Sequence, residues 1–148
     1  MALPPTQHDG DGTDGGGRRL HLLCLAGGGV RGLSSLYILQ RLMEQIDPRD
    51  PPKPCDYFDM ICGTSTGGLI AIMLGRLRMT VAQCIREYEQ LSASVFTKRR
   101  HRLNWKGQIQ GRFDHEALEE GIKAILKRLQ VPEDELLKEA GGQPECKV

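Results

Sequence analysis

The sequence lacks the long apolar run that a membrane-spanning helix requires. Its longest uninterrupted run, Leu69–Leu74, has six residues, whereas a spanning helix needs roughly 20. Residues 1–17 are polar and rich in glycine and aspartate, without the apolar stretch behind a basic start that marks a secretory signal. We therefore expect a cytoplasmic protein whose only membrane contact is peripheral.

The sequence also lacks a recognisable cysteine pattern. Its five cysteines are odd in number and include no C-x-x-C pair, which argues against a disulfide framework and against a zinc site. We expect the thiols to be buried and reduced, and we expect no metal site.

Net charge is low, at +1 from 20 basic and 19 acidic side chains among 148 residues. With 39% hydrophobic and 26% charged residues, the composition is typical of one ordinary soluble domain. The charge is uneven, because residues 76–112 hold nine basic and two acidic side chains. The run Lys98–Arg102 is either a solvated loop, which we favour, or a surface that attracts phosphate groups of lipids or nucleic acid. Of these partners we expect no nucleic acid.

The pattern of strand, tight glycine turn and helix occurs twice. Residues 1–19 form a leader with no apolar surface to bury, and we expect it to be disordered. We predict strands over 21–25 and 58–62 and an extended loop over 51–54. We predict helices over 33–46 and 69–74, a third that Thr80 caps and a fourth that Asp114 caps. Two strands do not complete a sheet, so the sequence indicates an α/β domain that is cut short.

Helical spacing also predicts which side chains face the core. In the first helix these are Leu36, Leu39, Leu42, Met43 and Ile46. In the third they are Val81, Cys84, Ile85, Tyr88 and Leu91, and in the fourth Leu118, Ile122, Ile125 and Leu129.

The second glycine turn matches G-x-S-x-G at Gly63, Ser65 and Gly67. A serine at the apex of a sharp strand-to-helix turn adopts strained backbone angles, and small neighbours leave room for that turn. The helix that follows directs its first amides toward the same place, where an oxyanion would develop. With a buried strand before it and an apolar helix after it, Ser65 is predicted to be a nucleophile.

The first glycine turn, Gly27–Gly32, allows two interpretations. It satisfies G-x-G-x-x-G, the dinucleotide-binding fingerprint, but the acidic residues near the expected distance, Asp47 and Asp50, lie in a proline-rich turn and not at a strand end. The alternative, which we favour, is an oxyanion hole that faces Ser65. Arg31 would then lie at the rim, where it could bind an anionic substrate group or pair with a local carboxylate.

A serine nucleophile also needs a base. Downstream of Ser65 the histidines are His101 and His115, and the aspartates are Asp114 and Asp134. Neither histidine makes a convincing Ser-His-Asp set, because His101 belongs to the basic run and His115 is adjacent to Asp114.

With both turns described, the sequence resembles the patatin-like phospholipase family, in its fungal-style branch, from about Leu20 to Leu129. That family has a D-G-G-G-x-[RK]-G motif and a G-x-S-x-G elbow, which residues 25–36 and 61–68 match. The resemblance implies a three-layer α/β fold related to cytosolic phospholipase A2, with a mainly parallel sheet. It also implies a Ser-Asp dyad that hydrolyses acyl esters of lipids without histidine, metal or cofactor.

Carried over to this sequence, the resemblance implies that Ser65 is the nucleophile and that the amides of Gly28 and Gly29 bind the oxyanion. The glycine-rich loop would comprise Gly27, Gly28, Gly29, Arg31 and Gly32, and the elbow Gly63, Thr64, Thr66 and Gly67.

Two positions depart from the family pattern. Ala26 stands where the glycine motif opens with aspartate, and neither downstream aspartate is followed by glycine as the dyad's D-G-[GA] motif requires. We therefore expect residues 20–130 to be the N-terminal part of a truncated patatin-like domain, followed by a charged, poorly ordered tail at 131–148. A longer product would carry further C-terminal domains. The alternatives are a catalytically inactive lipid-binding or interaction module and, less favoured, a dinucleotide-binding unit.

Overall fold

The computed structural model describes residues 19–29, 31–97, 115–135 and 146–148. In chain order its elements are β1 (Leu22–Leu25), α1 (Arg31–Ile46), α2 (Pro54–Tyr57), β2 (Met60–Gly63), α3 (Thr66–Ala71), the π-helix η1 (Ile72–Arg76), α4 (Val81–Thr97) and α5 (His115–Arg128). Residues 1–18 of the predicted leader, the basic run at Lys98–Arg102, which includes His101, and Asp114 lie outside the described residues.

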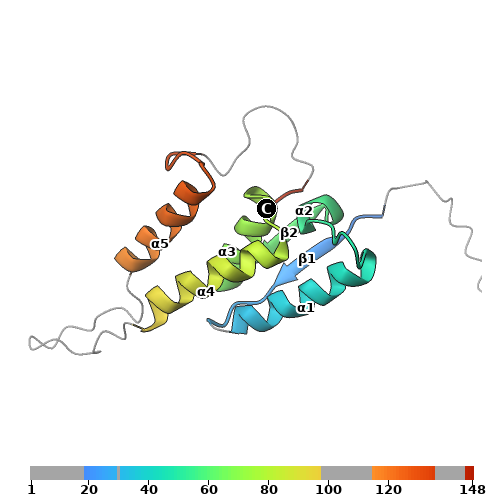
Figure 1. Ribbon diagram of the computed structural model, residues 1–148, viewed down its shortest axis with the longest axis horizontal. Helices are drawn as coiled ribbons and strands as arrows, with labels where there is room; N and C mark the ends of the chain where they lie inside the picture. Colours follow the sequence, from blue (N-terminus) through green and yellow to red (C-terminus); the bar gives the residue numbers. More distant parts are fainter. Residues whose placement is uncertain (1–18, 30, 98–114, 136–145) are drawn as a thin grey trace, which may run out of the picture.

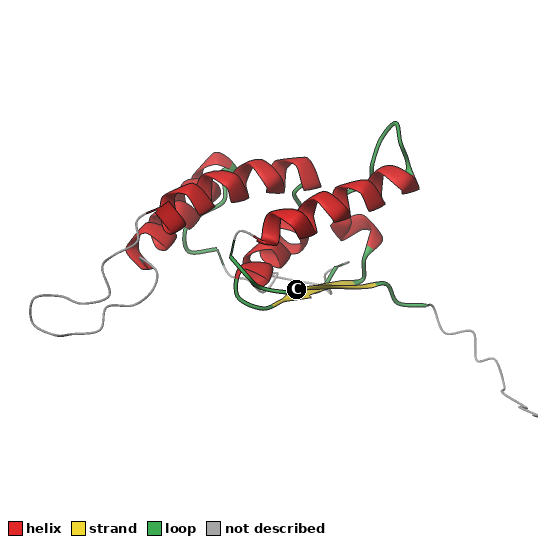
Figure 2. Ribbon diagram, turned by 90° about the horizontal axis from the view of Figure 1, so that it is seen from below, coloured by secondary structure: helices red, strands yellow, loops and turns green. Residues whose placement is uncertain are grey.

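The two strands form a small parallel sheet, in which Leu22 pairs with Met60 and Leu25 with Gly63. The described helices all lie on one side of this sheet (Figure 2). On the other edge of β2, the amide of Ile61 donates to the carbonyl oxygen of Lys147 at 2.8 Å. Helices together with a parallel sheet confirm the predicted α/β class.

The core lies between the helices and the covered face of the sheet. Helix α4 packs against α1 on one side and against α5 on the other (Figure 1). All five core residues predicted for α4 are buried, including Tyr88 and Cys84. The predicted core face is therefore correct at every position in α4, the helix that has neighbours on both sides.

Two predicted core positions of α1 are wrong. Leu36, Leu39 and Met43 are buried, but Leu42 and Ile46 are 46% and 40% exposed. Leu42 lies about 100° around the helix from Met43, and Ile46 is the last residue of α1. The buried stripe is thus narrower than the apolar spacing suggested.

Helix α5 buries less than predicted. Of its four expected core residues only Ile125 is fully buried, while Leu118, Ile122 and Leu129 are half-buried. Ile122 lines a cavity between α5 and the rest of the core, which is described with the site below.

Helix boundaries follow local chemistry. Thr80 caps α4 as predicted: the amide of Gln83 donates to the Thr80 hydroxyl at 3.1 Å, and the amide of Thr80 donates to the Gln83 side chain at 2.9 Å. This is a reciprocal capping box. The predicted extended loop at 51–54 is wrong at its end, because Pro54 begins α2. The fixed φ of proline suits a first helical position.

The helix after the second glycine turn is longer than predicted. It begins at Thr66 and continues through η1 to Arg76, whereas the apolar run suggested 69–74. Among the helices of the described part of the chain, none combines the length and apolarity that a membrane crossing needs.

The cysteines are only partly as predicted. Cys55, Cys84 and Cys146 are buried, but Cys24 is exposed and Cys62 is half-buried. The last two lie on the sheet, at positions of β1 and β2 that face away from the helices.

Candidate active site

Ser65 occupies the apex of the turn between β2 and α3. Its backbone has φ 54° and ψ −126°, a strained conformation for a residue with a side chain. The carbonyl oxygen of Ser65 accepts the amides of Gly68 at 2.9 Å and Leu69 at 3.3 Å, so Ser65 directly precedes the first turn of α3. The residue is exposed. This is the geometry by which a nucleophile elbow presents a serine hydroxyl at the end of a strand.

Close approach of the backbone explains the two glycines of the elbow. A Cβ at Gly63 would overlap the carbonyl oxygen of Gly67, and a Cβ at Gly67 would overlap the carbonyl oxygen of Leu25. In each case the obstacle is backbone, which cannot rotate away as a flexible side chain can. The strand-turn-helix connection therefore closes only with glycine at both positions.

The structure brings the first glycine turn against this elbow. A Cβ at Gly27 would lie 2.8 Å from the Cβ of Ser65. The amide of Gly27 donates to Oγ1 of Thr64, and the amide of Gly28 donates to Oγ1 of Thr66, both at 3.2 Å. The threonines on either side of Ser65 thus hold the glycine-rich loop in place.

Tyr88 of α4 holds the same loop from the core side. Its hydroxyl donates to the carbonyl oxygen of Gly29 at 2.6 Å. Burial raises the pKa of this phenol, against a hydrogen bond with Thr66 that lowers it, so the group stays neutral and remains a donor. A Cβ at Gly32 would lie 2.7 Å from the Tyr88 hydroxyl, which explains why the turn ends in glycine.

Sequence reasoning placed Tyr88 in the core and gave it no further part. One signal was available, because a tyrosine on an otherwise apolar helix face needs a hydrogen-bond partner when it is buried. Which partner that is depends on how α4 packs, and the bonded carbonyl is 59 residues away in the sequence.

The backbone amides of the glycine turn and of the first residue of α3 differ in their partners. The carbonyl oxygens of Gly28 and Gly29 accept the amides of Arg31 at 3.3 Å and Gly32 at 3.0 Å, as in the first turn of a helix. The amides of Gly29 and Thr66 donate to no described residue. The amide of Gly28 is bonded to Thr66.

Arg31 lies at the rim of this site. Its side chain passes 3.4 Å from where a Cβ of Gly28 would be, and it is exposed. It forms no ion pair with any residue that the structure describes. Both interpretations of Arg31, binding of an anionic group and pairing with a local carboxylate, stay open.

Within the described ranges, no histidine, aspartate or glutamate hydrogen-bonds the Ser65 hydroxyl. His115 begins α5, and Asp134 follows that helix. Asp47 accepts the amides of Arg49 at 2.9 Å and Asp50 at 3.2 Å. It therefore closes its own turn after α1 and does not lie at the end of a second strand, where a dinucleotide fingerprint places the acidic residue that binds the ribose.

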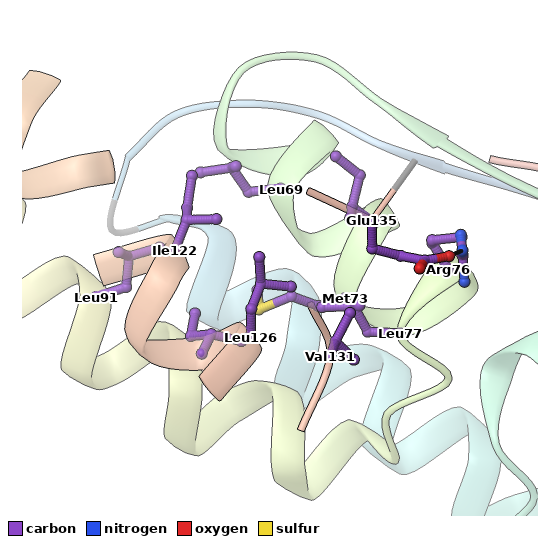
Figure 3. A pocket seen from close by; sticks show the side chains of 11 residues that line it. Leu69, Met73, Arg76, Leu77, Leu91, Ile122, Leu126, Val131 and Glu135 are labelled. Carbon is purple, nitrogen blue, oxygen red and sulfur yellow. Dashed lines mark hydrogen bonds and ion pairs between the residues drawn. The ribbon is translucent and has the colours of Figure 1, made fainter. Parts of the chain in front are cut away.

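An apolar cavity of about 150 Å³ is lined in part by Leu69, which follows Ser65 by four residues in the sequence (Figure 3). It begins at Leu69 and extends between η1, α4 and α5. An ion pair between Arg76 and Glu135, at 2.6 Å, borders it. The apolar lining includes Leu69, Met73, Leu91, Ile122, Leu126 and Val131.

Comparison with known proteins gives consistent relatives. A family model described as patatin-like phospholipase matches residues 23–142. Calcium-independent phospholipase A2-gamma of Rattus norvegicus is 40% identical over 83 residues, which cover 55% of this chain and 10% of the rat protein. Phospholipase A I of Arabidopsis thaliana is 41% identical over 80 residues, 53% of this chain and 6% of that protein.

Patatin-like protein 1 of Oryza sativa subsp. indica is 39% identical over 92 residues, 57% of this chain and 22% of that protein. The chain thus spans only a small part of the length of these relatives. No solved structure matches it. Because the family model covers more than half of the sequence and includes both glycine turns, the chain belongs to the patatin-like phospholipase family.

Proposed function

We propose that this chain carries the nucleophile and the oxyanion hole of a lipid acyl hydrolase. The observation that supports the proposal most strongly is the strained, exposed Ser65 at the start of α3, in contact with a glycine-rich turn. The relatives whose names describe them as phospholipases point to a phospholipid as the substrate.

In the proposed reaction the Ser65 oxygen attacks the carbonyl carbon of an acyl ester. The serine proton passes to a base, the carbonyl oxygen becomes an oxyanion, and the alcohol leaves with a proton to give an acyl-enzyme. Water then attacks the acyl-enzyme and releases a fatty acid. The family resemblance implies that the base is the aspartate of a D-G-[GA] motif, which this sequence does not contain downstream of Ser65.

The oxyanion would be bound by backbone amides. Those of Gly29 and Thr66 donate to no described residue, and that of Gly28 becomes available when the Thr66 hydroxyl rotates away. Preorganised amides of this kind stabilise the transition state more than the ground state, and each is worth about 3–4 kcal/mol in well-studied cases. Tyr88 would contribute indirectly, by fixing the carbonyl of Gly29 and hence the direction of the neighbouring amides.

The acyl chain would enter the cavity that begins at Leu69. Its lining is predominantly apolar, as a hydrocarbon requires. Arg31, exposed at the other side of the glycine loop and without an ion-pair partner among the described residues, would bind the phosphate of the head group. We also propose that the chain belongs to the fungal-style branch of the family.

The test is release of fatty acid from phospholipid vesicles by the protein that carries this domain, with the 148-residue chain assayed in parallel. Ser65→Ala is expected to abolish release. Ser34→Ala is the matched control, because Ser34 is an exposed serine of α1 and its loss should leave the rate unchanged. Unchanged release by Ser65→Ala would overturn the proposed mechanism.

A second candidate function follows from the missing base. No described acidic or histidine side chain forms a hydrogen bond with Ser65. This observation also fits a module that binds lipid without hydrolysing it. It predicts that the 148-residue chain binds the vesicles while neither the wild type nor Ser65→Ala releases fatty acid.

A further inference from the structure

Two thiols face each other on the sheet. Cys24 of β1 and Cys62 of β2 are paired in the parallel register, and their sulfur atoms are 3.1 Å apart. A disulfide forms between residues whose Cα atoms are about 4.4–6.8 Å apart, and neighbouring strands are separated by about 4.8 Å. The backbone is therefore already placed for a bond, and only a small movement of the two side chains is needed.

Figure 2 shows that the helices leave one face of the sheet uncovered. Cys24 and Cys62 lie on this face, because side chains alternate along a strand and the neighbouring Leu25 and Ile61 are buried on the other one. On the same face, Leu22 is 58% exposed and Met60 is 38% exposed. Cys24 is exposed as well, and Cys62 is half-buried. A small oxidant in solution can therefore reach the pair.

We propose that Cys24 and Cys62 form an oxidisable dithiol, which becomes an intrachain disulfide on reaction with a low-molecular-weight disulfide. In the first step one thiolate attacks a sulfur of the reagent, forms a mixed disulfide and releases one thiol. In the second step the other cysteine attacks the mixed disulfide, forms the Cys24–Cys62 bond and releases the second thiol. The protein loses two protons and two electrons, and the reagent is reduced to two thiols.

The other three cysteines differ from this pair. Cys55, Cys84 and Cys146 are all buried, so a reagent in solution reaches them less readily than it reaches Cys24, and burial raises the pKa of their thiols. In the part of the chain that the structure describes, no three possible metal ligands lie together. A pair of thiols without a third ligand suits a disulfide better than a metal ion.

The disulfide would join the two strands that carry the glycine turns. Leu25 and Gly63 are the next pair in the register, and the amide of Thr64 then donates to the carbonyl oxygen of Leu25 at 3.2 Å. The bond would lie below the loops, without contact with Ser65. The proposal is independent of the proposed function, because it requires only the two strands and the uncovered face.

The reaction is best tested on the full chain under native conditions, with oxidised glutathione at alkaline pH. Alkaline pH is chosen because the hydrogen bond with Cys24 raises the pKa of Cys62, and the thiolate is the reactive form. Titration of thiols after denaturation is expected to fall from five to three. Peptide mapping should then recover one linked pair, which contains Cys24 and Cys62.

Variants identify the pair. Cys24→Ser and Cys62→Ser should each lose the intrachain bond and retain bound glutathione on the remaining cysteine, since no partner resolves the mixed disulfide. Cys84→Ser, which removes a buried thiol, should still form the bond. Five free thiols after treatment, or a linked pair that includes Cys55, Cys84 or Cys146, would overturn the proposal. The wild-type peptide map decides the matter even if a variant fails to fold.

Discussion

The close approach of α3 to β1 predicts effects of different size for the same substitution at two adjacent glycines. A Cβ at Gly67 would lie 2.8 Å from the carbonyl carbon of Leu25 and 3.0 Å from the carbonyl oxygen of Ala26, and it would overlap the carbonyl oxygen of Leu25. A Cβ at Gly68 has its nearest neighbour, the carbonyl oxygen of Gly63, at 3.3 Å. Gly67→Ala and Gly68→Ala are thus a matched pair, in which the first Cβ overlaps backbone and the second makes a tight contact that a small shift can relieve.

The magnitudes follow from two opposing terms. Overpacking against a fixed neighbour costs about 1–3 kcal/mol, and here the neighbour is backbone on both sides. Alanine in place of glycine in a helix recovers up to about 1 kcal/mol. We expect Gly67→Ala to lower the free energy of unfolding by about 2 kcal/mol and Gly68→Ala to change it by less than about 1 kcal/mol.

The assay is urea unfolding of the two variants and the wild type, followed by circular dichroism. With a slope of about 1.5 kcal/mol per molar, the midpoint of Gly67→Ala should fall by roughly 1.3 M, and that of Gly68→Ala by no more than half of this. Equal midpoints for the two variants, or a lower midpoint for Gly68→Ala, would refute the close approach of α3 to β1.

Three further predictions rest on single contacts. Tyr88→Phe removes the hydrogen bond to Gly29 and should lower the free energy of unfolding by about 1 kcal/mol. Tyr37→Phe is the control and should leave it almost unchanged, because Tyr37 is exposed and its hydrogen bond is long, at 3.4 Å. Thermal unfolding compares the two variants. Thr80→Ala breaks the capping box and should lower stability by about 1 kcal/mol, measured as a shift of the urea midpoint. Ile122→Trp fills the cavity and should shift fatty-acid release toward shorter acyl chains, whereas an unchanged chain-length profile would exclude the cavity as the acyl site.

Local chemistry made much of the fold predictable. The glycine turns were identifiable because they interrupt apolar runs, and Thr80 could be assigned as a cap because a hydroxyl before a helix satisfies a free amide. The core face of α4 followed from its apolar spacing, and its five predicted core residues are buried in the packing of this helix with its neighbours. The short helix α2 was missed because a run of prolines favours extended backbone, while Pro54 itself is compatible with a first helical position.

Features that depend on packing between distant segments were not predictable. The bond from Tyr88 to Gly29 joins residues 59 apart, and the bond from Gly28 to Thr66 joins residues 38 apart. The pairing of Cys24 with Cys62 requires the register of two strands, which no local pattern specifies. The sequence could therefore single out Ser65 and the glycine loop, but not the side chains that hold them together.

The most direct test of the central claim is a map of the covalent adduct that a phosphonate ester, a mimic of the tetrahedral intermediate, forms with the ester-hydrolysing protein. If Ser65 is the nucleophile, one modified peptide is expected, and it contains Ser65. The adduct should be lost in Ser65→Ala and retained in Ser34→Ala. An adduct on a different residue would contradict the role of Ser65 as the nucleophile. Full hydrolytic activity with Ser65 unmodified would not be a positive result either, and it would contradict the same role.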